Sequence, residues 1–301
     1  MHTTMAVAAA TVGGALVAAL GVQLYRTYSR MREPMSGKEF KTFKLVERHA
    51  LSPQVRLLVF EVPFGKSLNL PTGKHIQLTF YDEHGQQVLR SYTPTETSVP
   101  GRFDLLMKVY SGGKMGTHLD ELRVGDRVRA RGPTGRVSYS PGQFAVGDKV
   151  IRCAHILMIA GGTGITPMMQ IVKAVLRNSG SDRTQVLLIY ASSNPSEVLL
   201  LHELAGFAEK HPTQFKLVLT VSRPTSEWEA KANAHDTPVA YETGRVTNSM
   251  LVRYAPKFIR QRPFPEYAVA GYCGPPSFEG AAKEVLEKLG YRQPSVNLFR
   301  W

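Results

Sequence analysis

Polar and apolar residues alternate with a period of two through much of residues 41–139, and this pattern predicts short β-strands. In the stretch RFDLLMKVY, for example, the apolar side chains alternate with Asp104, Lys108 and Tyr110. Short turns separate these strands at Pro63–Gly65, Pro71–Gly73, Pro100–Gly101 and Gly132–Pro133. Several short strands at such spacing predict a small antiparallel β-barrel domain, which we place at residues 33–147.

The spacing of the apolar residues along the chain changes after His155. The run HILMIA predicts a buried strand, and Met168, Ile171, Val172 and Val175 then share one face of a helix. Further strands are predicted in QVLLIYA, FKLVLTV, EYAVAGY and SVNLFRW, and further helices at 196–211, 248–254 and 277–289. This alternation predicts an α/β domain over residues 148–301, with a parallel sheet covered by helices on both faces. Ligands of such sheets bind at the carboxyl ends of the strands.

The first residues follow neither pattern. Met5–Tyr25, MAVAAATVGGALVAALGVQLY, carries no charge, and at about 1.5 Å per helical residue it is long enough to span a bilayer. Arg26, Arg30 and Arg32 follow, so we expect residues 1–32 to be a single-pass anchor that leaves the rest of the chain in the cytosol. A cleaved secretory signal would carry Lys or Arg before the apolar run, and a mitochondrial presequence would carry Arg within it. The endoplasmic reticulum and the mitochondrial outer membrane both remain open.

The composition of the chain limits the partners and metal cofactors that it could bind. The formal net charge is +13, which favours an acidic partner such as nucleic acid, anionic lipid or an acidic protein. The cysteines are Cys153 and Cys273, too few for a disulfide framework or for an iron–sulfur cluster held by four thiolates. No cysteine or histidine pair has the spacing of a zinc site, so we expect no metal.

The stretch GGTGITP, residues 161–167, lies where the first strand of the second domain meets its first helix. Thr166 is predicted to cap the helix and Pro167 to occupy its first position. A helix N-terminus preceded by bare backbone binds anions, and glycine lets a pyrophosphate or a flat ring approach the main chain. The spacing is G-x-G-x-x-P rather than G-x-G-x-x-G, and alone it is equally consistent with a tight turn.

Four motifs together are more specific: RSYTPTE at 90–96, GGKMGTHL at 112–119, AGGTGITPM at 160–168 and YCGPPSF at 272–278. In this order they resemble the ferredoxin reductase-like flavoproteins, and within them the NADH–cytochrome b5 reductase family. The resemblance covers residues 38–301. It implies an FAD-binding barrel domain followed by a domain that binds a nicotinamide nucleotide.

The resemblance assigns a set of residues to FAD. Arg90 binds the phosphates, Tyr92 packs on the isoalloxazine ring, and Thr93 bonds near its N5 atom as a catalytic residue. The remaining FAD residues that it implies are Ser91, Leu106, Lys108, Gly113, Lys114, Met115, Gly116 and Thr166. Gly116 replaces the serine of the family, so a hydroxyl contact is lost unless Thr117 supplies it. The loop before Gly112 is also short, which keeps FMN as an alternative cofactor.

The nucleotide residues that the resemblance implies are Lys108, Gly162, Thr163, Gly164, Ser222, Arg223, Cys273, Gly274 and Pro275. Cys273 lies near the site of hydride transfer and counts as the second catalytic residue, although the reaction needs no nucleophile. Lys108 is either close to the nicotinamide or a solvated strand lysine. Trp301 either covers the flavin and nicotinamide region or packs the final strand.

Ser222 and Arg223 depart from the NADH-specific pattern, which has an acidic residue at position 222. A hydroxyl beside a guanidinium suits a 2′-phosphate, so we expect NADPH to be accepted at least as well as NADH. The alternative is that Arg223 points into solvent.

The expected function is transfer of a hydride from NADH or NADPH to FAD, followed by single electrons to cytochrome b5 or a similar acidic haem protein. Alternatives are a flavin reductase serving an oxygenase, a quinone or a ferric chelate, and a non-catalytic, membrane-anchored nucleotide-binding protein. Arg127, Arg129 and Arg131 form either the docking face for the acceptor or a solvated strand face. We expect a monomer that does not bind nucleic acid.

Overall fold

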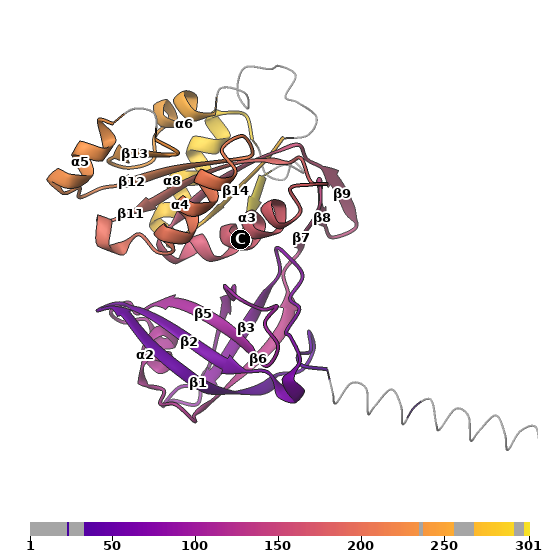
Figure 1. Ribbon diagram of the computed structural model, residues 1–301. Helices are drawn as coiled ribbons and strands as arrows, with labels where there is room; N and C mark the ends of the chain where they lie inside the picture. Colours follow the sequence, from indigo (N-terminus) through magenta and orange to yellow (C-terminus); the bar gives the residue numbers. More distant parts are fainter. Residues whose placement is uncertain (1–22, 24–32, 235–236, 256–267, 292–297) are drawn as a thin grey trace, which may run out of the picture.

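The computed structural model describes residues 23, 33–234, 237–255, 268–291 and 298–301 (Figure 1). Apart from Gln23, the apolar run predicted as an anchor lies outside these residues. Within the described ranges, no helix combines the length and the apolar character needed to cross a bilayer.

The first domain is built on an antiparallel six-stranded sheet, as predicted. Its strand order is β4-β3-β6-β1-β2-β5, and the bounds are β1 Lys41–Ser52, β2 Val55–Glu61, β3 His75–Tyr81, β4 Gln87–Tyr92, β5 Arg102–Lys108 and β6 Arg127–Thr134. The segment after β4 returns to the opposite edge strand, where an isolated bridge joins Glu96 to Asp104 and brings the two edges together. The rings of Phe43, Phe60 and Phe103 pack in the core that the sheet encloses.

Strand β5 differs from the simple alternating pattern because both of its faces are covered. Phe103 and Met107 pack in the first-domain core, but Leu106, on the other face, belongs to the apolar core of the second domain. Asp104 is also buried, and this burial raises its pKa although it pairs with Arg102 at 2.9 Å. The outer face of β5 is therefore part of the contact between the domains.

A three-stranded antiparallel meander follows the first sheet and was not predicted. It comprises β7 (Val137–Ser140), β8 (Gln143–Val146) and β9 (Lys149–Arg152). Its apolar residues, including Phe144, pack into the core of the second domain. The hydroxyl of Tyr139 donates a hydrogen bond of 2.5 Å to Asp182, so the meander is joined to the second domain by polar contacts too.

The second domain has the predicted parallel sheet, in the order β13-β12-β11-β10-β14-β15. Its elements are β10 His155–Gly161, α3 Ile165–Arg177, β11 Gln185–Ser192, α4 Leu201–Lys210, β12 Phe215–Val221, α5 Ser226–Ala232, β13 Val239–Thr243, α6 Asn248–Tyr254, β14 Ala268–Cys273, α8 Pro276–Lys288 and β15 Leu298–Arg300. Helices α3 and α4 contribute to the core on one face, and α6 and α8 to the core on the other.

The chain order reverses at β10, which pairs with β11 on one side and β14 on the other. Such a switch point leaves a crevice at the carboxyl ends of the two strands. Here those ends are Gly161 and Cys273, and Figure 1 shows that this part of the sheet faces the first domain.

The helix predicted at 196–211 begins later than expected. Residues Pro195–Glu197 form a short 3-10 turn, and Leu200 adopts a left-handed backbone conformation with φ of 57°. A left-handed non-glycine residue interrupts a helix. Helix α4 therefore starts only at Leu201.

Candidate functional site

A cavity of about 1060 Å³ lies between the two domains and is called here the large cavity. It is bounded by the end of β4, by β5, by the start of α2 (Lys114–Glu121), by the β10–α3 loop and by the β14–α8 loop. It brings together every residue that the sequence assigned to FAD: Arg90, Ser91, Tyr92, Thr93, Leu106, Lys108, Gly113, Lys114, Met115, Gly116 and Thr166.

The end of β4 presents an exposed cation and an aromatic ring to this cavity. Arg90 is exposed, and one of its guanidinium nitrogens donates 2.7 Å to the carbonyl of Leu89, which leaves other donors for a ligand. Burial raises the pKa of Tyr92 to about 12, so its phenol is neutral at physiological pH. A neutral phenol offers a flat face and a polar tip, which suits contact with a ring system.

Helix α2 begins directly at the large cavity. Gly112 has φ of +74°, which glycine adopts without strain, and Gly113 is the N-cap residue. The first backbone N–H groups of a helix lack partners within the helix and bind phosphate. Thr117, considered as a replacement for the missing serine hydroxyl, is exposed and does not line the cavity.

Lys114 has a partner that the sequence did not indicate. Its ammonium lies 2.7 Å from Asp82, and this hydrogen bond lowers the pKa of the carboxyl group. The pair fixes the lysine beside the start of α2. A phosphate at this helix end would therefore meet a positive charge that Asp82 already compensates in part.

The glycines of the β10–α3 loop serve the protein's own packing. A Cβ atom on Gly164 would lie 2.1 Å from the backbone oxygen of Cys273, and one on Gly161 would lie 2.7 Å from the ring of Phe278. The sequence interpretation, in which bare backbone makes room for a ligand, is therefore incomplete. Gly162 has φ of +54° and lines a neighbouring pocket. Of Gly161, Gly162 and Gly164, it is the glycine whose missing side chain can make room for a ligand.

The predicted helix cap at Thr166 is wrong. Helix α3 starts two residues earlier than predicted, at Ile165 with Gly164 as N-cap, because a 3-10 turn over Gly162–Gly164 leads directly into it. The hydroxyl of Thr166 instead donates 3.1 Å to the carbonyl of Thr163. Thr166 is buried and lines the large cavity, where its oxygen can still accept a hydrogen bond.

Cys273 ends β14 and lines the large cavity with Thr163, Gly164, Gly274 and Pro275. Burial raises the pKa of its thiol to about 12. The group is therefore protonated at physiological pH, which agrees with the expectation that the site needs no thiolate nucleophile.

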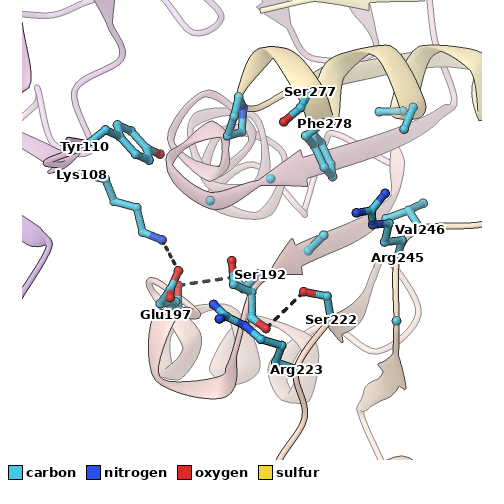
Figure 2. A pocket seen from close by; sticks show the side chains of 18 of the residues that line it. Lys108, Tyr110, Ser192, Glu197, Ser222, Arg223, Arg245, Val246, Ser277 and Phe278 are labelled. Carbon is cyan, nitrogen blue, oxygen red and sulfur yellow. Dashed lines mark hydrogen bonds and ion pairs between the residues drawn. The ribbon is translucent and has the colours of Figure 1, made fainter. Parts of the chain in front are cut away.

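A second pocket of about 480 Å³, called here the small cavity, lies over the carboxyl ends of β11, β12 and β13 (Figure 2). Four of the residues assigned to the nucleotide line it in addition to Lys108: Gly162, Ser222, Arg223 and Pro275. Lys108, Tyr110 and Pro275 line both cavities. The two cavities therefore meet at these residues.

An ion pair crosses between the domains at this junction. The Lys108 ammonium lies 2.6 Å from the Glu197 carboxylate, and the lysine side chain is only 7 % exposed (Figure 2). Asn194 donates 2.7 Å to the other oxygen of Glu197. The hydrogen bond from Lys108 lowers the pKa of Glu197, so this carboxyl group is ionised at neutral pH. Lys108 is thus not a solvated strand lysine in this structure.

The small cavity is also lined by three residues that no sequence motif assigned to a ligand: Glu197, Tyr110 and Arg245. A weak signal existed for Tyr110, because it stands two residues after Lys108 and so shares its side of an extended chain. Glu197 and Arg245 are single charged residues in loops, and nothing in the local pattern marks them.

Trp301 packs against the final strands and also lines the large cavity. A Cβ atom on Gly271 would lie 1.8 Å from the indole ring, so the ring packs directly on β14, and Phe299 packs against its edge. Trp301 nevertheless lines the large cavity. Its indole N–H is buried without a hydrogen-bond partner among the described residues. Such a donor is costly to leave unpaired and is suited to a ligand atom.

These features fit FAD. The large cavity combines a guanidinium group, a helix N-terminus, an aromatic face and hydroxyl groups, which match phosphate, ring and ring-edge contacts in turn. No cluster of three possible metal ligands occurs in the part of the chain that the structure describes.

Comparison with known proteins agrees with this geometry. Residues 42–139 match the family model of the oxidoreductase FAD-binding domain, and residues 158–284 match that of the oxidoreductase NAD-binding domain. The chain is 38 % identical to NADH–cytochrome b5 reductase 1 of Arabidopsis thaliana over 274 residues, which are 90 % of this chain and 88 % of the relative. It is 35 % identical to NADH-cytochrome b5 reductase 1 of Aspergillus oryzae, with 93 % and 89 % covered.

Among solved structures, the cytochrome b5 reductase domain of Ulva prolifera nitrate reductase superposes with a TM-score of 0.77. It is 33 % identical, and the match covers 89 % of this chain and 99 % of that domain. Together with the two domain matches, these likenesses establish FAD and a nicotinamide nucleotide as the cofactors. The chain belongs to the NADH–cytochrome b5 reductase family.

Proposed function

We propose that the protein passes a hydride from NADH or NADPH to FAD and then single electrons to cytochrome b5 or a similar acidic haem protein. The observation that carries this proposal is the meeting of the two cavities at Lys108, Tyr110 and Pro275. A ring held in the large cavity and a nicotinamide held in the small one would face each other there. Holding two reactants in contact is the main contribution of such a protein to the reaction.

The residues of the large cavity bind FAD and orient its ring. Arg90 and the N-terminus of α2 hold the phosphates, Tyr92 supports the ring, and Thr93 and Thr166 offer hydroxyl groups at its edge. The chemistry that FAD supplies when bound is acceptance of a hydride and release of single electrons. Lys108 is held by Glu197 at the entrance that the nicotinamide half of the nucleotide must pass.

We assign the acceptor from the relatives named above and from charge. Arg127 and Arg129 are exposed on β6, and Arg131 lies beside them with its guanidinium 4.8 Å from the centre of the Phe40 ring. The Arg131 side chain also donates 2.9 Å to Gln77. An aligned row of arginines would attract an acidic haem protein.

Reduction of cytochrome b5 should slow steeply as salt is added, because the Debye length falls to about 10 Å at 0.1 M ionic strength. The measurement is the initial rate of haem reduction by the full-length protein across a salt series. Replacing Arg127 and Arg129 with glutamate should lower the low-salt rate and flatten the salt dependence. The control is Lys210→Glu on an exposed residue of α4, which makes the same change of charge as each of these substitutions. A wild-type rate that does not change with ionic strength would show that the acceptor does not dock through electrostatic attraction.

We also propose that residues 1–32 anchor the protein in the endoplasmic reticulum or mitochondrial outer membrane, with both domains in the cytosol as a monomer. The support is the uncharged run Met5–Tyr25 and the arginines after it. Met35 is buried in the core of the first domain, and a deletion of residues 1–32 leaves it in place.

Deletion of residues 1–32 should give an active reductase that leaves the membrane fraction. Cells expressing the full and truncated chains are fractionated, and reductase activity is measured in pellet and supernatant. The full chain should sediment with the membranes and the truncated chain should not. Equal membrane association of the two forms would refute the anchor.

The direct test of the function compares acceptors. Purified protein with NADPH or NADH is offered cytochrome b5, a quinone or a ferric chelate, and each reduction is followed by absorbance. Cytochrome b5 should be reduced with the highest kcat/KM. A chain that reduces the quinone or the chelate faster than cytochrome b5 belongs to the alternative class of flavin reductases.

A further inference from the structure

The two ends of the small cavity differ in chemistry. Val246 and Phe278 form an apolar end, whereas Lys108 and Glu197 lie at the end that meets the large cavity (Figure 2). A flat base needs apolar walls, and hydride transfer requires the nicotinamide to reach the large cavity. The adenosine half of a bound nucleotide therefore belongs at the apolar end, beside Val246 and Phe278.

Arg245 stands at this adenosine end. It directly precedes Val246 and follows Gly244, whose φ of +92° turns the chain after β13. The N–H of Gly244 donates 2.8 Å to the carbonyl of Val221, the last residue of β12. This bond places Arg245 next to the loop that begins with Ser222. In Figure 2 the guanidinium of Arg245 lies on the Val246 and Phe278 side of the cavity.

Arg223 is directed to the other side. Figure 2 shows its side chain extending toward Ser192 and Glu197, and its charge acts on Glu197 together with the stronger effect of Lys108. The backbone supports this direction, because the N–H of Arg223 donates 2.8 Å to the carbonyl of Ser193 in the loop before Glu197. Its charge is thus partly compensated by a carboxylate.

Arg245, in contrast, has no carboxylate within ion-pair distance in the described parts of the chain. Its side chain is exposed and lines the cavity. The Ser222 hydroxyl nearby makes only a 3.3 Å hydrogen bond to the carbonyl of Ser193, so it can be redirected at small cost. A phosphate group on the adenosine ribose would meet an uncompensated guanidinium and a hydroxyl.

We infer that Arg245, with Ser222, binds the 2′-phosphate of NADPH and sets the preference for this nucleotide, whereas Arg223 faces the pyrophosphate side. This inference rests on the proposed use of NADPH. It shifts the specificity role from the adjacent pair Ser222–Arg223 to Ser222 and Arg245, which stand in the loops that follow two neighbouring strands, β12 and β13. A guanidinium can form two parallel hydrogen bonds to one phosphate, which an ammonium cannot reproduce.

The test measures binding rather than turnover alone. Full-length, flavin-loaded wild type and the variants Arg245→Ala, Arg245→Lys and Arg223→Ala are titrated with adenosine 2′,5′-bisphosphate and with adenosine 5′-monophosphate in a calorimeter. Arg245→Ala should weaken the bisphosphate by about 10- to 100-fold, as expected for loss of a charge-assisted hydrogen bond, and leave the monophosphate unchanged. Arg245→Lys should recover part of the loss, and Arg223→Ala should weaken both ligands to the same extent.

The outcomes separate this inference from the proposed use of NADPH. A wild type that binds the two ligands equally overturns both. A wild type that prefers the bisphosphate, with the preference lost in Arg223→Ala and kept in Arg245→Ala, overturns the role of Arg245 alone. The ratio of kcat/KM for NADPH and NADH in the same variants should follow the calorimetric ratio. Flavin absorbance of each variant shows that the fold is retained.

Discussion

Arg90→Ala is expected to purify with little flavin. In the wild type the guanidinium is exposed at the end of β4 and lines the large cavity, so a bound phosphate would take it as a charge-assisted partner. Loss of such a bond costs about 1.5–3 kcal/mol, which corresponds to roughly 10- to 150-fold weaker binding. The measurement is the ratio of flavin to protein absorbance after gel filtration, followed by titration of the apoprotein with FAD.

The matched control is Arg127→Ala, which removes an exposed arginine from strand β6 outside the large cavity. It should retain the flavin of the wild type. Full flavin occupancy in Arg90→Ala, or equal losses in both variants, would show that Arg90 does not hold the phosphates.

Gly164→Ala should distort the site where the two cavities meet. The added Cβ atom would lie 2.1 Å from the backbone oxygen of Cys273, so the β14–α8 loop must move. Overpacking of this kind costs typically about 1–3 kcal/mol. We expect a lower Tm, by about 2–12 °C at the roughly 2–4 °C per kcal/mol typical of larger domains, and a large loss of kcat with both nucleotides.

Gly280→Ala is the control for Gly164→Ala. Gly280 lies in helix α8, and a Cβ atom there would have nothing within 4 Å. Because alanine is the better helix former, this variant should be neutral or more stable by up to about 1 kcal/mol. If Gly164→Ala matches Gly280→Ala in both stability and turnover, the close approach of the two loops is not needed.

Much of the fold could be predicted because its signals are local. The run Ile156–Gly161 is apolar and buried throughout, as expected for a strand covered on both faces, and the amphipathic pattern of α3 follows it directly. The four-residue strands of the meander carry too short a pattern to be recognised. The burial of Leu106 on the second face of β5 was hidden for another reason, because the core that covers it comes from a distant part of the chain.

The residues of the candidate site likewise differ in whether a local sequence pattern marks them. Arg90, Thr93 and the glycines of 161–164 stand in contiguous motifs, which is why the sequence could assemble the large cavity. Glu197 reaches Lys108 across 89 positions of the chain, and no local pattern reports such a pair. The helix cap was misjudged for a structural reason: the 3-10 turn at Gly162–Gly164 leads directly into α3, which starts two residues before the predicted position, and no property of Thr166 reveals this.

The central claim is that a nucleotide in the small cavity delivers its hydride to a flavin in the large one. The most direct measurement is rapid mixing of the flavin-loaded, full-length protein with NADPH in the absence of oxygen, while the flavin absorbance is recorded. The account predicts that the yellow absorbance bleaches within the turnover time and that nucleotide deuterated at the transferred position bleaches it more slowly. A flavin whose absorbance is unchanged by either NADPH or NADH would contradict the account.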